Sequence, residues 1–338
     1  MADKLRAYQR AAVAAAERSW REHPGLGALI VLPTGAGKTH VGVELALRKC
    51  KGRGRIAWLA HRRELLDQAK ARLIGQSPRA RRRIGVVQGK TDEGDRQIVV
   101  ASLDTLTESG RRRRLLEAGP LSLIVVDEAH HSVAPTWRTA ITSLRARSAK
   151  AGCRPALLGL TATPERHDGR SLGGLYRVAY EYEVGDAQAA GHLVHYDHVV
   201  RSGIEDLVKG AVNAVLEHRD RRALVFTSTI DDAQTVAWQL AKRGLRAAWV
   251  SGNVSAEQRA RTINRFRRGR LRVLCNAALL TEGTDLPQCD MVVVARSLKS
   301  APLYKQMLGR ALRPARGKSR ALLVTLADRP IDVIGGGA

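Results

Sequence analysis

A glycine-rich turn beside an apolar segment constrains the fold of this chain more than any other feature. The apolar run 28–32 is followed by Pro-Thr-Gly-Ala-Gly-Lys-Thr at 33–39, and then by an amphipathic segment. This order predicts a strand, a tight turn and a helix, whose backbone N–H groups can surround a phosphate chain. Lys38 would reach the β- and γ-phosphates, and the Thr39 hydroxyl would hold Mg²⁺. The full eight-residue pattern is not met, because Leu32 stands where the first glycine is expected.

A second apolar run, residues 121–126, ends in the acidic pair Asp127 and Glu128. Such a continuous run is typical of a buried parallel strand, whose carboxyl end faces the ligand crevice of an open sheet. Asp127 would take Mg²⁺ through its water shell, and Glu128 would orient and deprotonate an attacking water. By itself the pair could also be an acidic helix cap. Together with the glycine-rich turn, it favours nucleotide hydrolysis.

A third segment, residues 306–313, carries two arginines in a helical spacing. Gln306, Arg310 and Arg313 stand at i, i+4 and i+7, which places them on one face if the segment is a helix. Guanidinium groups suit the charge that develops on a transferring phosphoryl group. The alternative is an ordinary surface helix of a basic protein.

In their order along the chain, these segments resemble the motifs of superfamily 2 helicases of the DEAH-box kind. The resemblance covers nearly the whole chain and points to the DNA-acting branch, with RadD-like and XPB-like helicases and restriction-enzyme motor subunits. The doubled histidine at 130–131 and the segment 188–194 fit that branch. Segments that resemble motifs Q, Ia, Ib, III, IV and V lie at 5–10, 60–65, 101–106, 159–164, 224–229 and 280–287.

The resemblance implies ATP and Mg²⁺ as cofactors and assigns the nucleotide contacts. Gln9 would read the adenine base. Closure of two lobes would bring Arg310 and Arg313 to the phosphates bound at Lys38, so that ATP binding drives closure. The expected nucleotide contacts are Arg6, Gln9, Thr34, Gly35, Ala36, Gly37, Lys38, Thr39, Gly283 and Asp285.

The resemblance also implies a nucleic-acid path and residues that couple it to the nucleotide. His130, Thr161 and Thr163 are expected to relay the nucleotide state. Short hydroxyls and backbone N–H groups suit phosphate binding without base readout. The expected nucleic-acid contacts are His61, Arg62, Ser102, Thr105, Thr227, Ser228 and Thr281.

The charge of the chain agrees with a polyanionic partner. It contains 57 Lys and Arg against 32 Asp and Glu, a net charge of +25. This excess favours salt-dependent, sequence-tolerant binding to a polyanion. The resemblance implies that this partner is DNA rather than RNA, single-stranded or forked. The arginine tracts at 81–83 and 111–114 are interpreted as solvated, with specific contacts on the motif residues instead.

The 338 residues, 44% of them apolar, suit two domains of ordinary size. The predicted fold class is α/β: two tandem RecA-like domains at 1–200 and 201–330, each a mostly parallel sheet with helices on both faces, and a disordered tail at 331–338. Residues 176–200 are interpreted as the crossover between domains. Strands are expected at 56–60, 84–87, 98–101, 121–126, 156–160, 223–227, 247–250, 273–276, 291–295 and 321–325.

No apolar run reaches the length of a membrane span, and the four cysteines show no CxxC spacing. A cytoplasmic location without a zinc site is therefore expected. The prediction is an ATP-dependent DNA helicase or translocase acting in repair or recombination. Alternatives are an RNA helicase, a duplex translocase that does not separate strands, and a non-enzymatic nucleic-acid-binding protein.

Overall fold

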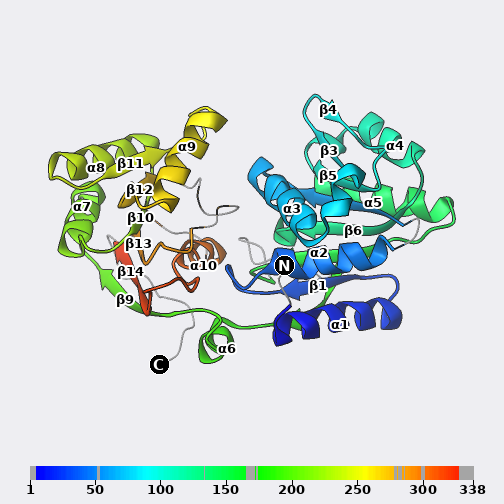
Figure 1. Cartoon of the computed structure of the whole chain (residues 1–338), viewed down its shortest axis with the longest axis horizontal. Coiled ribbons are helices and arrows are strands. Elements are labelled where there is room, and N and C mark those ends of the chain that lie inside the picture. The colour runs from blue at the N-terminus through cyan, green and yellow to red at the C-terminus, as the bar shows by residue number, and fades with distance from the viewer. Residues whose placement is uncertain are drawn as a thin grey trace. The chain divides into compact units, whose positions relative to one another are not determined.

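The chain folds into two compact units (Figure 1). The first comprises Met1–Pro33 and Gly37–Glu183, and the second comprises Val184–Ala338 with Thr34–Ala36. The computed structural model describes residues 5–51, 54–132, 134–164, 172, 174–277, 280, 284, 286–297 and 301–326.

The first unit is built on a mostly parallel sheet with strand order β4-β3-β5-β2-β6-β7-β1-β8. Its described strand pairs are parallel except for the short β3–β4 hairpin. The strands are β1 (Gly27–Val31), β2 (Arg55–Ala60), β3 (Ile84–Gln88), β4 (Thr91–Asp92), β5 (Ile98–Ser102), β6 (Leu121–Asp127), β7 (Ala156–Thr161) and β8 (Tyr176–Glu181).

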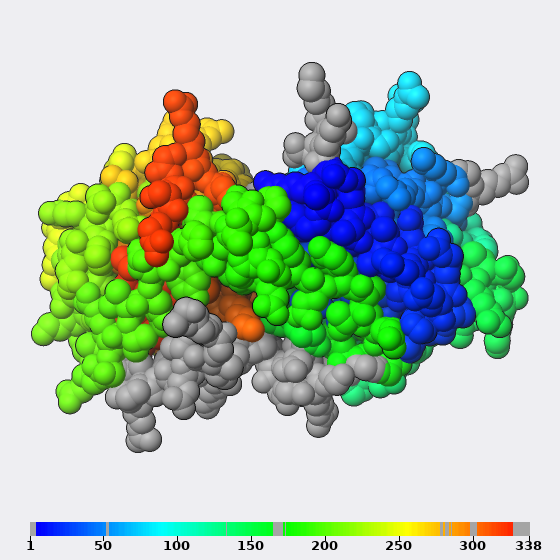
Figure 2. All heavy atoms as spheres, turned by 90° about the horizontal axis from the view of Figure 1, so that it is seen from below, coloured from blue at the N-terminus to red at the C-terminus, as the bar shows by residue number. Residues whose placement is uncertain are grey.

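Helices cover both faces of this sheet, which explains why its central strands are apolar throughout. On one face, α5 packs its Trp137, Ile141 and Leu144 against strand residues such as Val126. On the other, α1 lies along β1 and β8, and its dark blue surface borders a green one in Figure 2. The helices are α1 (Ala7–Glu22), α2 (Lys38–Lys49), α3 (Arg63–Gln76), α4 (Ser109–Glu117) and α5 (Pro135–Lys150), with 3₁₀ turns η1 (Pro78–Arg83), η2 (Thr105–Thr107) and η3 (Ala129–His131).

The second unit repeats the architecture with a described sheet of order β11-β12-β10-β13-β14-β9, all of whose pairs are parallel. Its core joins α7 and α8 to the central strands. The elements are α6 (Val184–Ala189), β9 (His195–Arg201), α7 (Leu207–Glu217), β10 (Ala223–Thr227), α8 (Ile230–Lys242), β11 (Ala247–Val250), α9 (Ala256–Arg267), β12 (Val273–Asn276), β13 (Met291–Ala295), α10 (Ala301–Leu308) and β14 (Arg320–Leu326).

The predicted strands agree with the structure to within one residue at either end. The predicted domain boundary at residue 200 falls too late, because the compact units divide between Glu183 and Val184. The reason is that β9 pairs with β14 over its whole length and so belongs to the second sheet. The predicted tail, 331–338, lies outside the described residues.

Two sequence expectations concern the environment of the chain. No helix in the described ranges has both the length and the apolar character needed to cross a membrane. Cys50, Cys153, Cys275 and Cys289 are free thiols, and burial raises the pKa of Cys50 to about 11. Burial also raises the pKa of Cys275 and Cys289, so these three buried thiols are little ionised at neutral pH.

Candidate nucleotide and nucleic-acid sites

The glycine-rich turn joins β1 to α2 and leaves the N-terminus of that helix open. Gly35 and Gly37 have φ angles of 96° and 81°, values that favour glycine. Helix α2 begins at Lys38, and its first turn contains no acidic residue. No side chain in the described part of the chain caps this helix. Neither a capping side chain nor an acidic residue of its own first turn therefore neutralises this helix end, which suits an anion.

Lys38 meets Glu128, which lies far from it in the sequence. The Lys38 Nζ and the Glu128 Oε1 are 4.0 Å apart, and both side chains are about nine-tenths buried. The Lys38 Nζ also donates to the Leu32 carbonyl at 3.4 Å. A buried charge needs a partner, and these two side chains of opposite charge supply one for each other. The structure thus brings together two residues that the sequence predicts separately.

The backbone at Glu128 is strained where the acidic pair leaves β6. Its φ is 51°, the one positive φ of a residue other than glycine among the described residues. The Glu128 N–H donates to the Asp127 Oδ1 at 3.1 Å, which holds the turn. Such strain persists only where the surrounding structure enforces it, and it is concentrated at functional sites. Both carboxylates lie at the carboxyl end of a central strand, as predicted.

The expected coupling residues form one hydrogen-bonded cluster next to Glu128. The Thr161 hydroxyl donates to the Thr163 carbonyl at 2.8 Å, so it is an acceptor towards His130. The His130 Nδ1 is 3.2 Å from that hydroxyl and 3.5 Å from the Glu128 Oε2. The His130 Nδ1 therefore lies between the Glu128 carboxylate and the Thr161 hydroxyl at the end of β7. A coupling role for these residues stays a prediction.

Gln9 lies against the glycine-rich turn. Its Oε1 accepts the Arg6 N–H at 2.9 Å, and a β-carbon built at Gly37 would stand 2.5 Å from its Nε2. Beside it, the Tyr8 ring stacks on the Tyr182 ring, with centroids 4.5 Å apart and planes at 18°. Burial raises the pKa of Tyr8. The stack was missed in the sequence, where only an aromatic residue before Gln9 hinted at it.

The expected nucleic-acid contacts of the first unit gather at one edge of the sheet. Ala60, before His61, pairs with Ser102, so the carboxyl ends of β2 and β5 are neighbours. The Arg62 Nε donates to the His61 Nε2 at 3.2 Å. Thr105 is half-buried, and its hydroxyl accepts the Gly89 N–H at 3.2 Å. These positions meet as predicted, although Ser102 is buried and presents little surface.

Three aromatic rings behind this edge join it to the acidic pair. The His61 ring centroid is 4.4 Å from that of His131, which is 4.1 Å from that of His130. Trp137 packs against both His61 and His131, and its Nε1 donates to the Asp104 Oδ1 at 3.0 Å. The roles of His131 and Trp137 were missed, because contact between distant segments leaves no local pattern.

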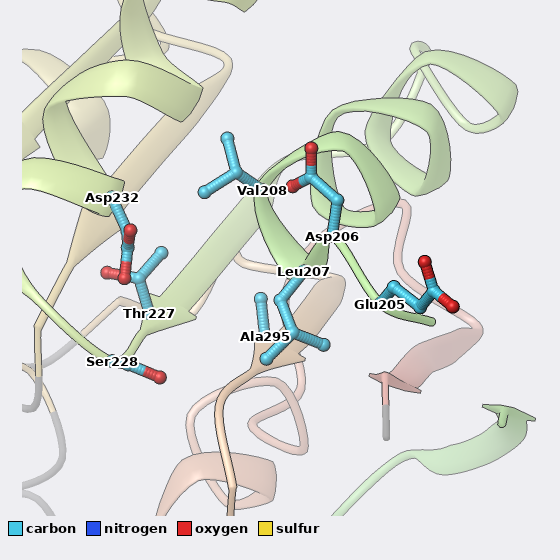
Figure 3. Close-up of a pocket in the computed structure, with 8 residues that line it drawn as sticks. All are labelled: Glu205, Asp206, Leu207, Val208, Thr227, Ser228, Asp232 and Ala295. Carbon is cyan, nitrogen blue, oxygen red and sulfur yellow. The ribbon is translucent and has the colours of Figure 1, made fainter. Parts of the chain in front are cut away.

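In the second unit, the neighbouring residues Thr227 and Ser228 differ in burial. Thr227 is 1% exposed, and its hydroxyl donates to the Thr229 carbonyl at 2.8 Å. That burial argues against phosphate contact through the Thr227 hydroxyl and leaves the exposed Ser228 as the candidate. Ser228 lines a cavity of about 330 Å³ together with the carboxylates of Glu205, Asp206 and Asp232 (Figure 3). The negative charge of these three carboxylates opposes phosphate binding in the cavity.

The predicted helix across 306–313 is wrong in its second half. Helix α10 ends at Leu308, and the Arg310 N–H bonds to the Met307 carbonyl at 3.1 Å in a tighter turn. Glycine at 309 weakens the helix, and Pro314 disfavours helical backbone at Arg313.

The arginines of this segment therefore do not share one helix face with Gln306. Arg310 is buried and donates to the Thr284 carbonyl at 2.7 Å, whereas Arg313 is half-buried. The Arg313 carbonyl accepts from the Lys318 Nζ at 2.8 Å. Three predicted contacts lie outside the described residues: Thr281, Gly283 and Asp285.

Comparison with known families supports the motif analysis. Residues 2–166 match the family described as type III restriction enzyme, res subunit, and residues 204–315 match the helicase conserved C-terminal domain. The two matches together span most of the chain. The chain therefore contains both of these domains, in the order in which its motifs resemble those of superfamily 2 helicases.

Particular relatives extend this result. The chain is 27% identical over 357 residues to the putative ATP-dependent helicase IRC3 of Saccharomyces cerevisiae, covering 95% of this chain and 51% of the relative. It is 29% identical over 360 residues to the DNA 3′-5′ helicase XPB of Kineococcus radiotolerans, covering 96% and 60%. The chain thus spans only about half the length of such relatives.

A solved structure supports the fold. The helicase MrfA bound to DNA aligns with a TM-score of 0.76 at 17% identity, over 97% of this chain and 47% of that one. At this identity the likeness concerns the fold alone. It confirms the predicted tandem RecA-like architecture.

Proposed function

We propose that this chain hydrolyses ATP and couples hydrolysis to movement along nucleic acid, with DNA as the substrate. The observation that carries the proposal is the buried pair of Lys38 and Glu128, 4.0 Å apart beside an uncapped helix N-terminus. A cation for phosphate and a carboxylate for water thus lie at one site. The two helicase family matches and the relatives named as DNA helicases support a motor that acts on DNA.

The first unit fits a magnesium nucleotide. Because Gly37 has no β-carbon, the Gln9 amide can approach the turn closely; a β-carbon there would stand 2.5 Å from the Gln9 Nε2. Lys38 would bind the phosphates, while Thr39 and Asp127 would hold Mg²⁺ with oxygen atoms, the ligand type that this ion prefers. The ion, when bound, neutralises charge on the phosphate oxygens.

The residues around Glu128 are arranged for proton transfer. Its carboxylate would accept the proton of an attacking water, as a general base does. The strained backbone at Glu128 and the nearby His130 Nδ1 fix the direction of the carboxylate. Lys38 is the cation that faces Glu128, and phosphate would compete for it. Once Lys38 turns to phosphate, the carboxylate can accept a hydrogen bond from water in its place.

Finer assignments follow from the motifs and remain part of this proposal. The tetrad Asp-Glu-Ala-His at 127–130 assigns the chain to the DEAH-box kind, and the DNA-acting branch suggests a role in repair or recombination. Buried free thiols are consistent with a reducing cytoplasm.

The test is phosphate release without nucleic acid and with single-stranded DNA, duplex DNA or RNA. We expect turnover that DNA stimulates more than RNA, and Lys38→Ala should abolish it while the circular dichroism spectrum stays unchanged. Stimulation by RNA alone would favour an RNA helicase. No turnover under any condition would favour a non-enzymatic binder. Displacement of one strand from forked, 3′-tailed and 5′-tailed duplexes then distinguishes unwinding from translocation without strand separation.

A further inference from the structure

Helix α9 carries a stripe of arginines on the face opposite its buried side. Arg261, Arg265 and Arg268 stand at i, i+4 and i+7, and all three side chains are exposed. The opposite face buries Ile263 and Phe266, which fix the helix to its unit. Since helix positions i, i+4 and i+7 lie above one another, the three guanidinium groups project from one side.

The chain turns sharply after α9 and adds a fourth arginine to this stripe. Gly269, with a φ of 72°, ends the helix. Its N–H bonds to the Phe266 carbonyl at 3.0 Å, and the Arg270 N–H bonds to the Arg265 carbonyl at 2.9 Å. This pattern of two bonds is the Schellman motif, a rigid way to end a helix. Arg270 is therefore held beside Arg265 by the backbone.

The result is a hollow of about 350 Å³, which we call the α9 hollow. Its lining contains no carboxylate among the described residues. The nearest acid on the helix, Glu257, pairs with Arg261 on its exposed side at 2.5 Å. Within the described part of the chain, the remaining three arginines have no such ion pair, and like charges at this spacing repel. The lining residues are Arg261, Asn264, Arg265, Arg268 and Arg270.

We propose that the α9 hollow binds the phosphodiester backbone of DNA, at a site separate from the helicase motifs. The inference rests on the proposed DNA motor. Guanidinium forks match phosphate geometry, and a polyanion relieves the repulsion among the arginines. From Arg261 to Arg268 the helix rises about 10 Å. That distance matches about three phosphates along one duplex strand. No base is read, so the contact tolerates any sequence.

The test compares two triple variants of the full chain that remove equal charge. The variant Arg265→Ala/Arg268→Ala/Arg270→Ala removes three of the guanidinium groups that line the α9 hollow. The control, Arg79→Ala/Arg81→Ala/Arg82→Ala, removes three exposed arginines of η1. Binding of labelled duplex DNA is measured across a salt series, together with basal and DNA-stimulated phosphate release. Thermal unfolding checks that both variants fold.

We expect the hollow variant to bind DNA ~10-fold more weakly, with a log–log salt slope shallower by about 2 to 3. Its half-saturating DNA concentration in the ATPase assay should rise similarly, with basal turnover unchanged. Equal losses in both variants would overturn the proposal, because only total charge would then matter. An unaltered affinity would also overturn it. If the unmodified chain neither bound DNA nor responded to it, the proposed motor function itself would fail.

Discussion

Each sheet has a strand that leads directly into a helix: β1 into α2, and β10 into α8. The N-termini of these two helices differ in how they are capped. Helix α2 begins after Gly37 with no capping side chain in the described chain and no acid in its first turn. Helix α8 begins after Thr229, whose hydroxyl accepts the Asp232 N–H at 3.0 Å. In return, the Asp232 carboxylate accepts the Thr229 N–H at 3.0 Å.

This difference shows how one architecture serves two purposes. At α8, a carboxylate of the chain itself occupies the position that an anion would take, and the capping box satisfies the end of the helix. At α2, the same position is left for a ligand, and the glycines give the turn its shape. The second unit instead offers cations on separate elements, in the turn after α10 and along α9.

The largest change should follow Arg313→Ala, which tests whether the second unit supplies charge to hydrolysis. If Arg313 acts on the transferring phosphoryl group, turnover should fall ~10³-fold or more. The measurement is single-turnover phosphate release, with ATP affinity determined in parallel. Arg316→Ala, an exposed neighbour, is the matched control and should leave the rate within about twofold. An unchanged rate in Arg313→Ala would show that Arg313 supplies no charge to the transferring phosphoryl group.

Glu128→Gln should reduce hydrolysis by ~10² to 10³, because the amide cannot accept a proton from water. ATP binding should be retained or tightened, since the counter-charge facing Lys38 is lost. Stopped-flow measurement with a fluorescent nucleotide separates the two steps. Faster hydrolysis would contradict the role of Glu128 as the base.

Gly37→Ala and Gly244→Ala form a matched pair, because both glycines have a φ of 81°. The added β-carbon meets the Gln9 Nε2 at 2.5 Å in the first case and nothing within 4 Å in the second. Both should lose ~1 kcal/mol of stability from backbone strain. Only Gly37→Ala should also weaken ATP binding, by ~10-fold if the collision costs about 1.4 kcal/mol. Isothermal titration calorimetry measures the ATP affinity of both variants. Equal affinities would contradict this role of Gly37.

The smallest effect is expected for Thr229→Ala. Loss of the cap on α8 should lower the free energy of unfolding by ~1 kcal/mol, measured by urea denaturation. Turnover at a temperature well below unfolding should stay within about twofold, because this helix end serves stability. A tenfold loss of turnover would show that the β10–α8 connection takes part in the reaction.

Local pattern predicted most of the fold. Strands such as β10 and β13 were placed to the residue, because an apolar run bounded by polar turns can be buried on both sheet faces only as a central strand. The turn at 33–39 and the acidic pair after β6 were also found, since both are defined by adjacent residues. The end of α10 was not, because Arg310 leaves the helical pattern to bond with the Thr284 carbonyl.

The sequence by itself determined the order of elements, the parallel α/β class and the residue types of the nucleotide site, because each is encoded within a few neighbouring positions. Only the tertiary structure decided that Lys38 faces Glu128, that the His61 and His131 rings are in contact, and that Thr227 is buried. Strands β1 and β6 are separated by β7 in the sheet, although β7 comes later in the chain. Distances between such segments depend on the order in which the strands lie side by side in the sheet. No local sequence pattern encodes that order.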